Sequence, residues 1–312
     1  MPLINVLRIL NVSRIVKNIS IMPLNVFDLK FYLRVDESID RVLSFFLIMV
    51  AMDHRLSRPG RPYETVIDGE TYRGADLLYY LGARKFEEDP EFFTPKKLAF
   101  ISCYDVIKWL SVGNLSPPDP ELRMHLLNDI GVKSIKLFNG DYTELLKFSE
   151  GFLRRRDGYG FLDLLKVFKA YQDPVEKKSH LLIKFLVYRG LFKPLDLENL
   201  EVAVDNHLTR VAIRLGFIEL EKDLLEKIHG RIEVSHNEDV IIRLCSREAY
   251  KLLSKFSGVN TLLLDDMFWI FGRTICTYDN PKCKECRFKN VCKAYENDIY
   301  LTEHTYINTW YY

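Results

Sequence analysis

Four cysteines near the C-terminus have the residue type and the spacing to hold a metal centre. They lie within 17 residues, in the run CTYDNPKCKECRFKNVC, with the spacing C-x6-C-x2-C-x5-C: Cys276, Cys283, Cys286 and Cys292. A zinc ribbon normally supplies two C-x2-C pairs, whereas this run has one such pair flanked by two single cysteines. One compact loop around a centre suits a [4Fe–4S] cluster with four cysteine ligands. The alternatives are zinc and uncoordinated thiols.

The longer segment DDMFWIFGRTICTYDNPKCKECRFKNVC resembles the iron–sulfur loop of endonuclease III and its DNA-glycosylase relatives. The cysteine spacing is the same, and an apolar helix leads into the loop in both. This resemblance to the helix-hairpin-helix glycosylase superfamily implies an all-α, two-lobed fold. It also implies a [4Fe–4S] cofactor and an enzyme that cleaves base–sugar bonds in nucleic acid.

The same resemblance singles out Asp205 in the run LEVAVDNHLTRVAIRLGFIEL. In the superfamily the catalytic aspartate follows a valine, opens a helix and precedes an arginine, which here is Arg210. His207 lies between them and is a candidate for substrate binding. A carboxylate stabilises the positive charge that develops on the sugar as the N-glycosidic bond breaks. Asp205 can also serve simply as a helix N-cap, and the two roles are compatible.

A lysine is the second catalytic candidate. Bifunctional members of the superfamily have a Lys-Thr step at a helix start, which Lys178-Ser179 in YQDPVEKKSHLLIKFL resembles. A lysine amine with a lowered pKa can attack the anomeric carbon and form a Schiff base. The alternative is a solvated lysine beside Lys177. The family hairpin that holds a DNA phosphate contains glycine, whereas residues 173–176 here read DPVE, which puts duplex binding by this element in doubt.

A second resemblance extends over about residues 63–271. The order of motifs, from DGETYRGADLLYYL through NGDYTELL and AVDNHLTRVAIRLGFI to GVNTLLLDDMFWI, is similar to that of the queuosine-salvage nucleotide N-glycosylases. That family has a related helical fold and lacks the cysteine loop. It implies a modified nucleotide with a 7-deazaguanine-type base as the alternative substrate. Its lysine and aspartate fall near Lys178 and Asp205, so these two residues do not discriminate between the families.

The stretch AMDHRLSRPGRPYET is dense in polar side chains. Its arginines could hold a phosphate and its tyrosine could stack on a base, so that the stretch would line a base pocket. The alternative is a solvated loop that leaves a buried helix. The substrate-binding candidates in this stretch are Asp53, His54, Arg55, Arg58 and Tyr63.

Composition limits the class of protein. The chain has 312 residues, of which 48% are hydrophobic, so it can bury a large core. A net charge of +1 argues against a protein that coats nucleic acid by bulk charge. The apolar run at residues 42–52 is too short to span a bilayer. Clustered cysteines without a secretory signal indicate a reducing compartment, and we expect a cytoplasmic monomer without membrane contact.

Helical spacing dominates the chain and predicts an all-α fold with at most one small β-hairpin, at ETVIDGETY. We expect an N-terminal extension at residues 1–26, a two-lobed helical domain at 27–271, and the cluster loop with a tail at 272–312. The predicted helices cover residues 38–52, 74–81, 95–111, 121–137, 142–155, 160–170, 177–190, 206–215, 220–228, 246–255 and 261–271.

Three functions are compatible with these patterns. The first is an N-glycosidase that acts on a modified or damaged base in DNA, with AP-lyase activity if Lys178 is a nucleophile. The second is a nucleotide or nucleoside N-glycohydrolase that releases a 7-deazaguanine base. The third is a non-catalytic iron–sulfur protein that binds nucleic acid.

Overall fold

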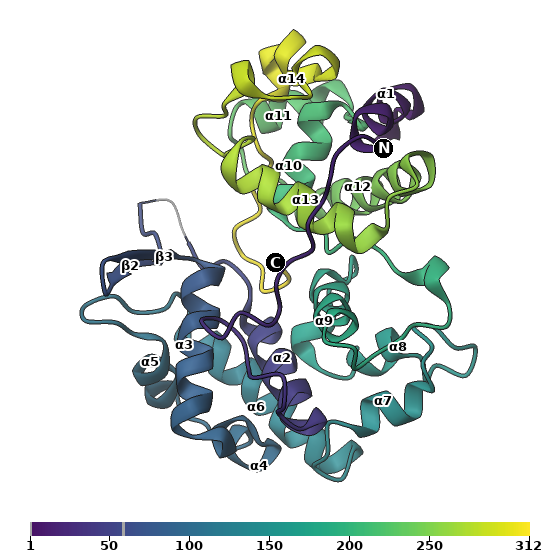
Figure 1. Cartoon of the computed structure of the whole chain (residues 1–312). Helices are drawn as coiled ribbons and strands as arrows, with labels where there is room; N and C mark the ends of the chain where they lie inside the picture. Colours follow the sequence, from purple (N-terminus) through teal and green to yellow (C-terminus); the bar gives the residue numbers. More distant parts are fainter. Residues whose placement is uncertain (1, 58–59) are drawn as a thin grey trace. The chain divides into compact units, whose positions relative to one another are not determined.

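The structure is a computed structural model that describes residues 2–57 and 60–312 (Figure 1). The described residues form mainly helices, with two short two-stranded sheets, which confirms the predicted all-α fold class. The chain divides into two compact units. Unit 1 combines the residues up to Leu24 with Leu200–Asn308, and unit 2 combines Asn25–Asn199 with Thr309–Tyr312.

Unit 2 is built around α2 (Ile39–Met52), which carries the longest apolar run. Residues 42–52 are buried, and α3, α6 and α9 all pack against this helix. Phe46 of α2 stacks on Phe185 of α9, with ring centroids 4.8 Å apart. The apolar run is therefore a core helix. Among the described residues, no helix combines the length and apolarity needed to cross a membrane.

The other helices of unit 2 follow in chain order. They are α3 (Ala75–Glu88), η1 (Pro90–Phe93), α4 (Pro95–Leu98), α5 (Cys103–Leu110), α6 (Pro120–Leu137), α7 (Glu144–Ser149), α8 (Phe161–Leu165), η2 (Lys169–Tyr171), α9 (Lys177–Tyr188) and η3 (Leu197–Asn199).

A β-hairpin in unit 2 confirms the predicted turn. Strands β2 (Glu64–Ile67) and β3 (Glu70–Arg73) pair antiparallel. Asp68 and Gly69 have φ angles of 50° and 81°, and a two-residue type I′ turn needs positive φ at both positions. The structure adds a second sheet in unit 1, where β1 (Leu3–Ile4) pairs with β4 (Ile218–Glu219). Strands of two residues are too short to give a periodic sequence signal.

Three helices form the centre of unit 1: α10 (Asn206–Leu215), α12 (His236–Ser257) and α13 (Thr261–Thr274). Tyr250 of α12 packs on Phe268 of α13, with ring centroids 5.2 Å apart. The remaining elements of unit 1 besides its sheet are α1 (Val6–Val16), α11 (Lys222–His229), η4 (Cys283–Glu285), η5 (Lys289–Val291), α14 (Lys293–Glu296) and η6 (Asp298–Tyr300).

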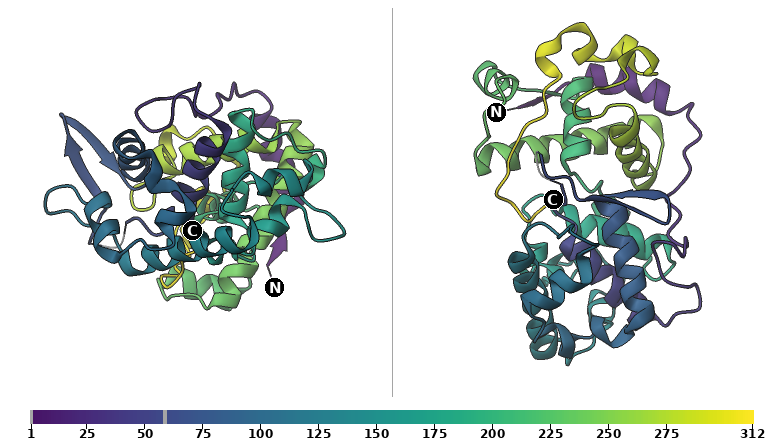
Figure 2. Two further views of the ribbon diagram at one scale, coloured as in Figure 1. Left: turned by 90° about the horizontal axis from the view of Figure 1, so that it is seen from below. Right: turned by 90° about the vertical axis from the view of Figure 1, so that its left-hand side faces the viewer.

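The N-terminal segment contributes helix α1 to unit 1. This helix buries Ile9, Val12 and Val16 and packs against α12. Figure 2 shows α1, in purple, beside the yellow cysteine segment in its right-hand view. Arg8 of α1 donates to the carbonyl of Val291 at 3.2 Å and forms an ion pair with Glu296. The first residues of the chain therefore brace the cysteine segment.

Capping boxes explain two differences from the predicted helices. The helix predicted over 95–111 is divided into α4 and α5, because the Ser102 hydroxyl and the Asp105 carboxylate each accept the other residue's backbone N–H. Helix α12 begins at His236 rather than at residue 246, because Ser235 and Glu238 form the same motif. In both cases short polar side chains set the helix start, and the apolar pattern does not reveal it.

The capping box of α12 makes a pH-dependent contribution to stability. Hydrogen bonds from Lys227 and from the Ser235 backbone lower the pKa of Glu238 from 4.5 to about 2. The stabilisation is complete above pH 4.5 and is lost as the pH falls toward 2. Since the side chain is 33% exposed, we expect Glu238→Gln to cost about 1 kcal/mol at neutral pH.

Urea unfolding at several pH values measures this effect. The stability gap between the wild type and Glu238→Gln should shrink below pH 4.5. Glu226→Gln is the matched control, because Glu226 is 56% exposed in an ion pair on α11. If the difference in unfolding free energy between the wild type and Glu238→Gln stays constant with pH, the lowered pKa of Glu238 is not a source of stability.

Candidate active site and cysteine cavity

Asp205 is the N-cap residue of α10. Its Oδ1 accepts the backbone N–H of Leu208 at 3.0 Å, and its carbonyl oxygen accepts the Thr209 hydroxyl at 2.7 Å. The residue is 7% exposed. The N-cap interpretation is therefore confirmed. A capped carboxylate is held in one orientation. A group that stabilises a developing positive charge needs such a fixed orientation.

Arg210 connects α10 to the start of the cysteine segment. Its Nε donates to the carbonyl of Cys276 at 2.9 Å, and its Nη2 donates to the carbonyl of Gly272 at 2.7 Å. The same Nη2 lies 2.8 Å from His207 Nδ1, which must be the acceptor because a guanidinium only donates. Gly272 permits this approach, since a Cβ there would lie 3.0 Å from His207 Cβ. One buried arginine thus joins His207, which follows Asp205 by two residues, to the start of the cysteine segment.

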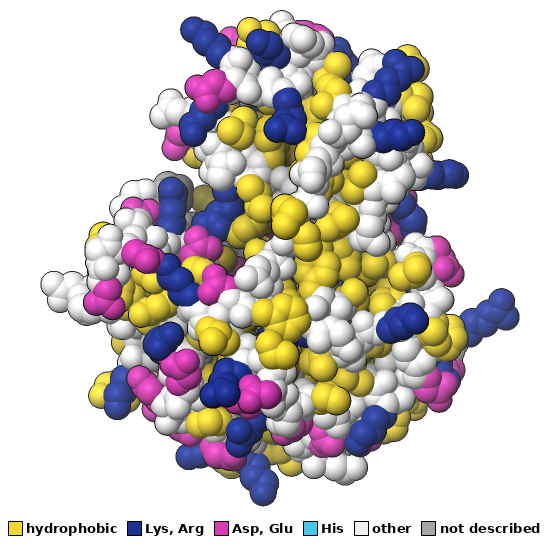
Figure 3. All heavy atoms as spheres, viewed as in Figure 1, with side chains coloured by type: hydrophobic (Ala, Val, Ile, Leu, Met, Phe, Trp, Pro, Cys, Tyr) yellow, Lys and Arg dark blue, Asp and Glu magenta, His cyan; other side chains and the backbone are white. Residues whose placement is uncertain are grey.

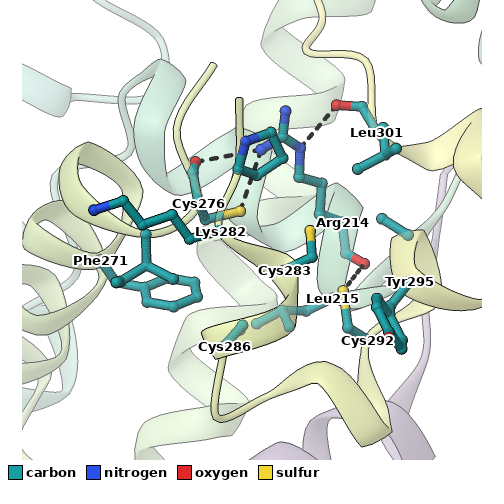
Figure 4. Close-up of a pocket in the computed structure, with 13 residues that line it drawn as sticks. Arg214, Leu215, Phe271, Cys276, Lys282, Cys283, Cys286, Cys292, Tyr295 and Leu301 are labelled. Carbon is teal, nitrogen blue, oxygen red and sulfur yellow. Dashed lines mark hydrogen bonds between the residues drawn. The ribbon is translucent and has the colours of Figure 1, made fainter. Parts of the chain in front are cut away.

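All four cysteines of the loop line one cavity, which contains about 360 Å³ of empty space including the part open to solvent (Figure 4). Arg214 of α10 reaches into it, and its Nη1 donates to Cys276 Sγ at 3.3 Å. The same guanidinium also donates to the carbonyls of Thr277 and Tyr278. A backbone N–H, that of Phe288, lies 3.4 Å from Cys286 Sγ. The four cysteines therefore line a shared space, in which the sulfur atoms of Cys276 and Cys286 accept hydrogen bonds and the thiol of Cys292 donates to the carbonyl of Arg214.

The donor set of this cavity fits an iron–sulfur cluster. Burial raises the pKa of Cys292 to about 11, and burial also raises the pKa of Cys283 and Cys286. Thiols become ligands only when a cation replaces their protons. Within residues 2–57 and 60–312, no group of three or more His, Cys, Asp or Glu side chains is arranged to hold a metal ion. Zinc needs its thiolates to converge at about 2.3 Å on one point, whereas a [4Fe–4S] cluster binds each cysteine at a different corner.

In unit 2, Lys178 lies inside a polar cluster at the end of α2. It is fully buried, so the alternative of a solvated lysine is wrong. Its Nζ donates to the carbonyl of Ala51 and lies 3.1 Å from Nδ1 of His54. Burial, with the positive charges of Lys177 and Arg123, holds the pKa of Lys178 well below its ordinary value. The side chain is therefore in an environment that favours the neutral amine.

The same cluster caps the last carbonyl groups of α2. Arg123 of α6 donates to the carbonyls of Met52 and His54, and Lys177 donates to the carbonyl of Asp53 at 3.1 Å. Cations are favourable at a helix C-terminus, so this arrangement stabilises α2. Burial also lowers the pKa of His54, whose Nε2 has no hydrogen-bond partner among the residues that the structure describes. The structure thus brings together Asp53, His54 and Lys178, three of the predicted site residues.

The turn at residues 173–176 is closed by its own side chains. The Asp173 carboxylate accepts the backbone N–H groups of Val175 and Lys177, both at 3.0 Å. Glu176, with a φ of 61°, pairs with Arg154 and with Lys166. Burial alone would raise the pKa of Glu176, but the hydrogen bonds from Arg154 and Lys166 and the positive charge of Arg154 together outweigh it and leave that pKa lowered. Backbone N–H groups of the turn are therefore occupied by the Asp173 carboxylate, and the negative charge of Glu176 is balanced by Arg154 and Lys166.

Comparison with known proteins identifies the fold. No protein-family model matches the chain, and no curated protein matches it either. A solved structure of endonuclease III, trapped as a covalent intermediate with DNA in an estranged-adenine complex, covers 95% of this chain and 100% of its own. The TM-score is 0.52 and the sequence identity 14%. The fold is endonuclease III-like. The resemblance to the queuosine-salvage family stays a prediction.

In this endonuclease III-like chain, the described residues of the predicted base-binding stretch lie in different surroundings. Tyr63 is 1% exposed and its hydroxyl donates to the carbonyl of Leu110, so the expectation that it stacks on a base is wrong. The Arg55 guanidinium lies 5.3 Å from the ring centroid of Tyr312. Arg58 lies outside the described residues. Of the candidates in this stretch that the structure describes, Asp53 and His54 join the buried cluster of Lys178.

Several residues in each unit have no motif in the sequence. In unit 2, Arg123 reaches the cluster of Lys178 from α6. In unit 1, Glu303 pairs with Arg210 and His304 lies beside Asp239, and both come from a distant part of the chain. Arg214 could have been found, because it lies four residues after Arg210 and shares one side of α10 with it. Asp205 and Lys178 belong to different units of the endonuclease III-like fold.

Proposed function

We propose that the chain is an N-glycosidase that cleaves the base–sugar bond of a modified or damaged nucleobase, with DNA as its substrate. One observation supports this proposal: the fold is endonuclease III-like, and Asp205, which the sequence resemblance singles out as the catalytic aspartate, is a buried N-cap held in one orientation. The related solved structure is a complex with DNA, which supports DNA as the partner.

The proposed reaction is a displacement at the anomeric carbon. The bond from the sugar C1′ to the base nitrogen breaks and its electron pair leaves with the base, which then takes up a proton. Water forms the new bond to C1′ and releases its proton. Asp205 stabilises the positive charge on the sugar between these events. The protein's own contribution is a carboxylate fixed in one orientation, so that little reorganisation is needed during the reaction.

Lys178 is proposed as the nucleophile of a second, lyase activity. Its amine would replace water at C1′ of an abasic sugar and form a Schiff base, which a neutral amine can do at neutral pH. Lys178→Gln keeps a donor for the carbonyl of Ala51 but removes the nucleophile. We expect this variant to lose all borohydride-trapped protein–DNA adduct. Lys177→Gln, which changes the neighbouring buried lysine, is the matched control and should still form the adduct.

The cysteine loop is proposed to hold a [4Fe–4S] cluster through Cys276, Cys283, Cys286 and Cys292. When bound, such a cluster cross-links a segment that has little regular structure of its own. Lysine and arginine side chains around the loop would offset the negative charge of the cluster and could face phosphates: Lys282, Lys284, Arg287, Lys289 and Lys293.

A second candidate is an N-glycohydrolase that releases a 7-deazaguanine-type base from a free nucleotide. The self-closed turn at residues 173–176 favours it, because backbone N–H groups of that turn are already occupied by Asp173 and are not offered to a phosphate of DNA. Charges of both signs are also interspersed over the face seen in Figure 3, and no broad basic surface appears there.

A screen for base release decides between these functions. Pure, iron-loaded protein is incubated with a panel of duplex and single-stranded DNA lesions and with free modified nucleotides, and released bases are detected by mass spectrometry. Release from DNA supports the first function, and release only from nucleotides supports the second. If no substrate releases a base, both proposals fail, and DNA binding at low salt would then favour a non-catalytic nucleic-acid-binding protein.

A further inference from the structure

Unit 1 contains a buried charged network that the proposed chemistry does not use. Asp239 and Arg243 of α12 are 0% exposed, and His304 is 2% exposed. His304 Nε2 lies 3.0 Å from Asp239 Oδ1, and since a carboxylate accepts, Nε2 carries the proton. Arg243 Nη1 lies 3.5 Å from Asp239 Oδ2. Burying such groups is costly, so the network needs a reason to be there.

The network ends beside the proposed catalytic carboxylate. Arg243 Nη2 donates to the carbonyl oxygen of Val204 at 3.3 Å, and Val204 directly precedes Asp205. The residue before it is also held, because the backbone N–H of Ala203 donates to Asp265 Oδ2 at 2.6 Å. The backbone that enters α10 is therefore fixed by charged side chains of α12 and α13.

The neighbour of His304 holds the other flank of Asp205. Glu303 Oε1 accepts the side-chain amide of Asn206 at 3.2 Å, and its Oε2 pairs with Arg210. The side chain of Glu303 is 9% exposed. Glu303 thus contacts Asn206 directly, on one side of Asp205. His304 is linked to Val204, on the other side, through Asp239 and Arg243.

The tail that carries these two residues is itself anchored. We call residues 301–308 the C-terminal strap. The carbonyl of Leu301 accepts Arg214 Nε at 2.8 Å, and the carbonyl of Thr305 accepts the backbone N–H of Val234 at 2.9 Å. Further along, the backbone N–H of Ile307 donates to Glu233. The anchors at Leu301 and Thr305 lie on either side of Glu303 and His304 in the chain, so this pair is held between them.

We propose that Glu303 and His304 are positioning residues for Asp205, a role that rests on the proposed function of that carboxylate. The strap follows the cysteine segment in the chain. Its contacts hold the start of α10 on both sides of Asp205. Displacement of a catalytic group by about 1 Å can cost on the order of a hundredfold in rate. The strap therefore acts on the rate of the chemical step rather than on substrate binding.

Single-turnover and steady-state kinetics of base release test this role. Glu303→Ala and His304→Leu should each lower kcat by about ten- to a hundredfold, with KM unchanged within about twofold. His304→Gln, whose amide can still donate to Asp239, should recover most of the rate. Glu233→Ala is the matched control, because it removes a strap contact at Ile307, beyond the anchors at Leu301 and Thr305, and should keep the wild-type kcat.

Hydrogen exchange gives a readout that does not depend on activity. The peptide covering residues 203–210 should exchange faster in Glu303→Ala and His304→Leu than in the wild type and in Glu233→Ala. A loss of kcat that His304→Gln does not recover, or that Glu233→Ala shares, would overturn the positioning role. Unchanged exchange of this peptide would also overturn it. If the wild type releases no base, the proposed function fails, while the exchange result still decides whether the strap holds the entrance of α10.

Discussion

Asp205→Asn should lower the rate of base release by about a hundredfold or more, which corresponds to about 2–4 kcal/mol of barrier. The lost charge is the one that stabilises the sugar cation. Stability should change little, because asparagine is as good an N-cap as aspartate and its oxygen can still accept the N–H of Leu208. Base release under single-turnover conditions and thermal unfolding measure the two effects separately.

Two companion variants complete this test. Asp205→Ala removes the cap as well as the charge, so it should lose both activity and about 1 kcal/mol of stability. Asp105→Asn makes the same change of acid to amide in the first turn of α5 and should retain activity. A rate for Asp205→Asn within threefold of the wild type would mean that Asp205 is only an N-cap.

Cys286→Ser should abolish the iron–sulfur cluster. Wild-type protein loaded anaerobically with iron and sulfide is expected to turn brown and to contain equal amounts of iron and inorganic sulfide. The variant should contain only background iron. Its Tm should fall by at least about 5 °C, because the free energy of metal binding is also free energy of folding. Metal analysis, visible absorbance and thermal unfolding provide the measurements.

Cys103→Ser is the control for this experiment, because Cys103 starts α5 in unit 2 and takes no part in the cavity. It should bind iron like the wild type. Colourless wild-type protein with one zinc ion per chain would show that the loop is a zinc site. Protein that takes up neither metal would favour uncoordinated thiols.

The sequence predicted correctly those elements whose ends are set by adjacent residues. Helix α10 was predicted with its observed bounds, because Asp205 caps its start and Gly216, with a φ of 76°, ends it. The hairpin at Asp68 and Gly69 is also encoded in adjacent residues. The start of α12 was missed, because a polar first turn carries no apolar period.

The burial of polar side chains could not be read from the sequence. Tyr63 and Lys178 both looked accessible in a charged segment, and both are buried with hydrogen bonds to carbonyl groups of other helices. Their partners, such as Leu110 and Ala51, are distant in sequence and carry no motif. A buried polar group is defined by what surrounds it, and a one-dimensional pattern does not contain that information.

The sequence by itself determined the helical class, the cysteine spacing and the capped carboxylate, because each depends on residues within a few positions of one another. Only the tertiary structure decided what lies around them: Arg210 joining His207 to the cysteine segment, Arg123 and Lys178 closing the end of α2, and the strap with Glu303 and His304. These contacts link residues far apart in the chain, and packing of the whole unit is required to bring them together.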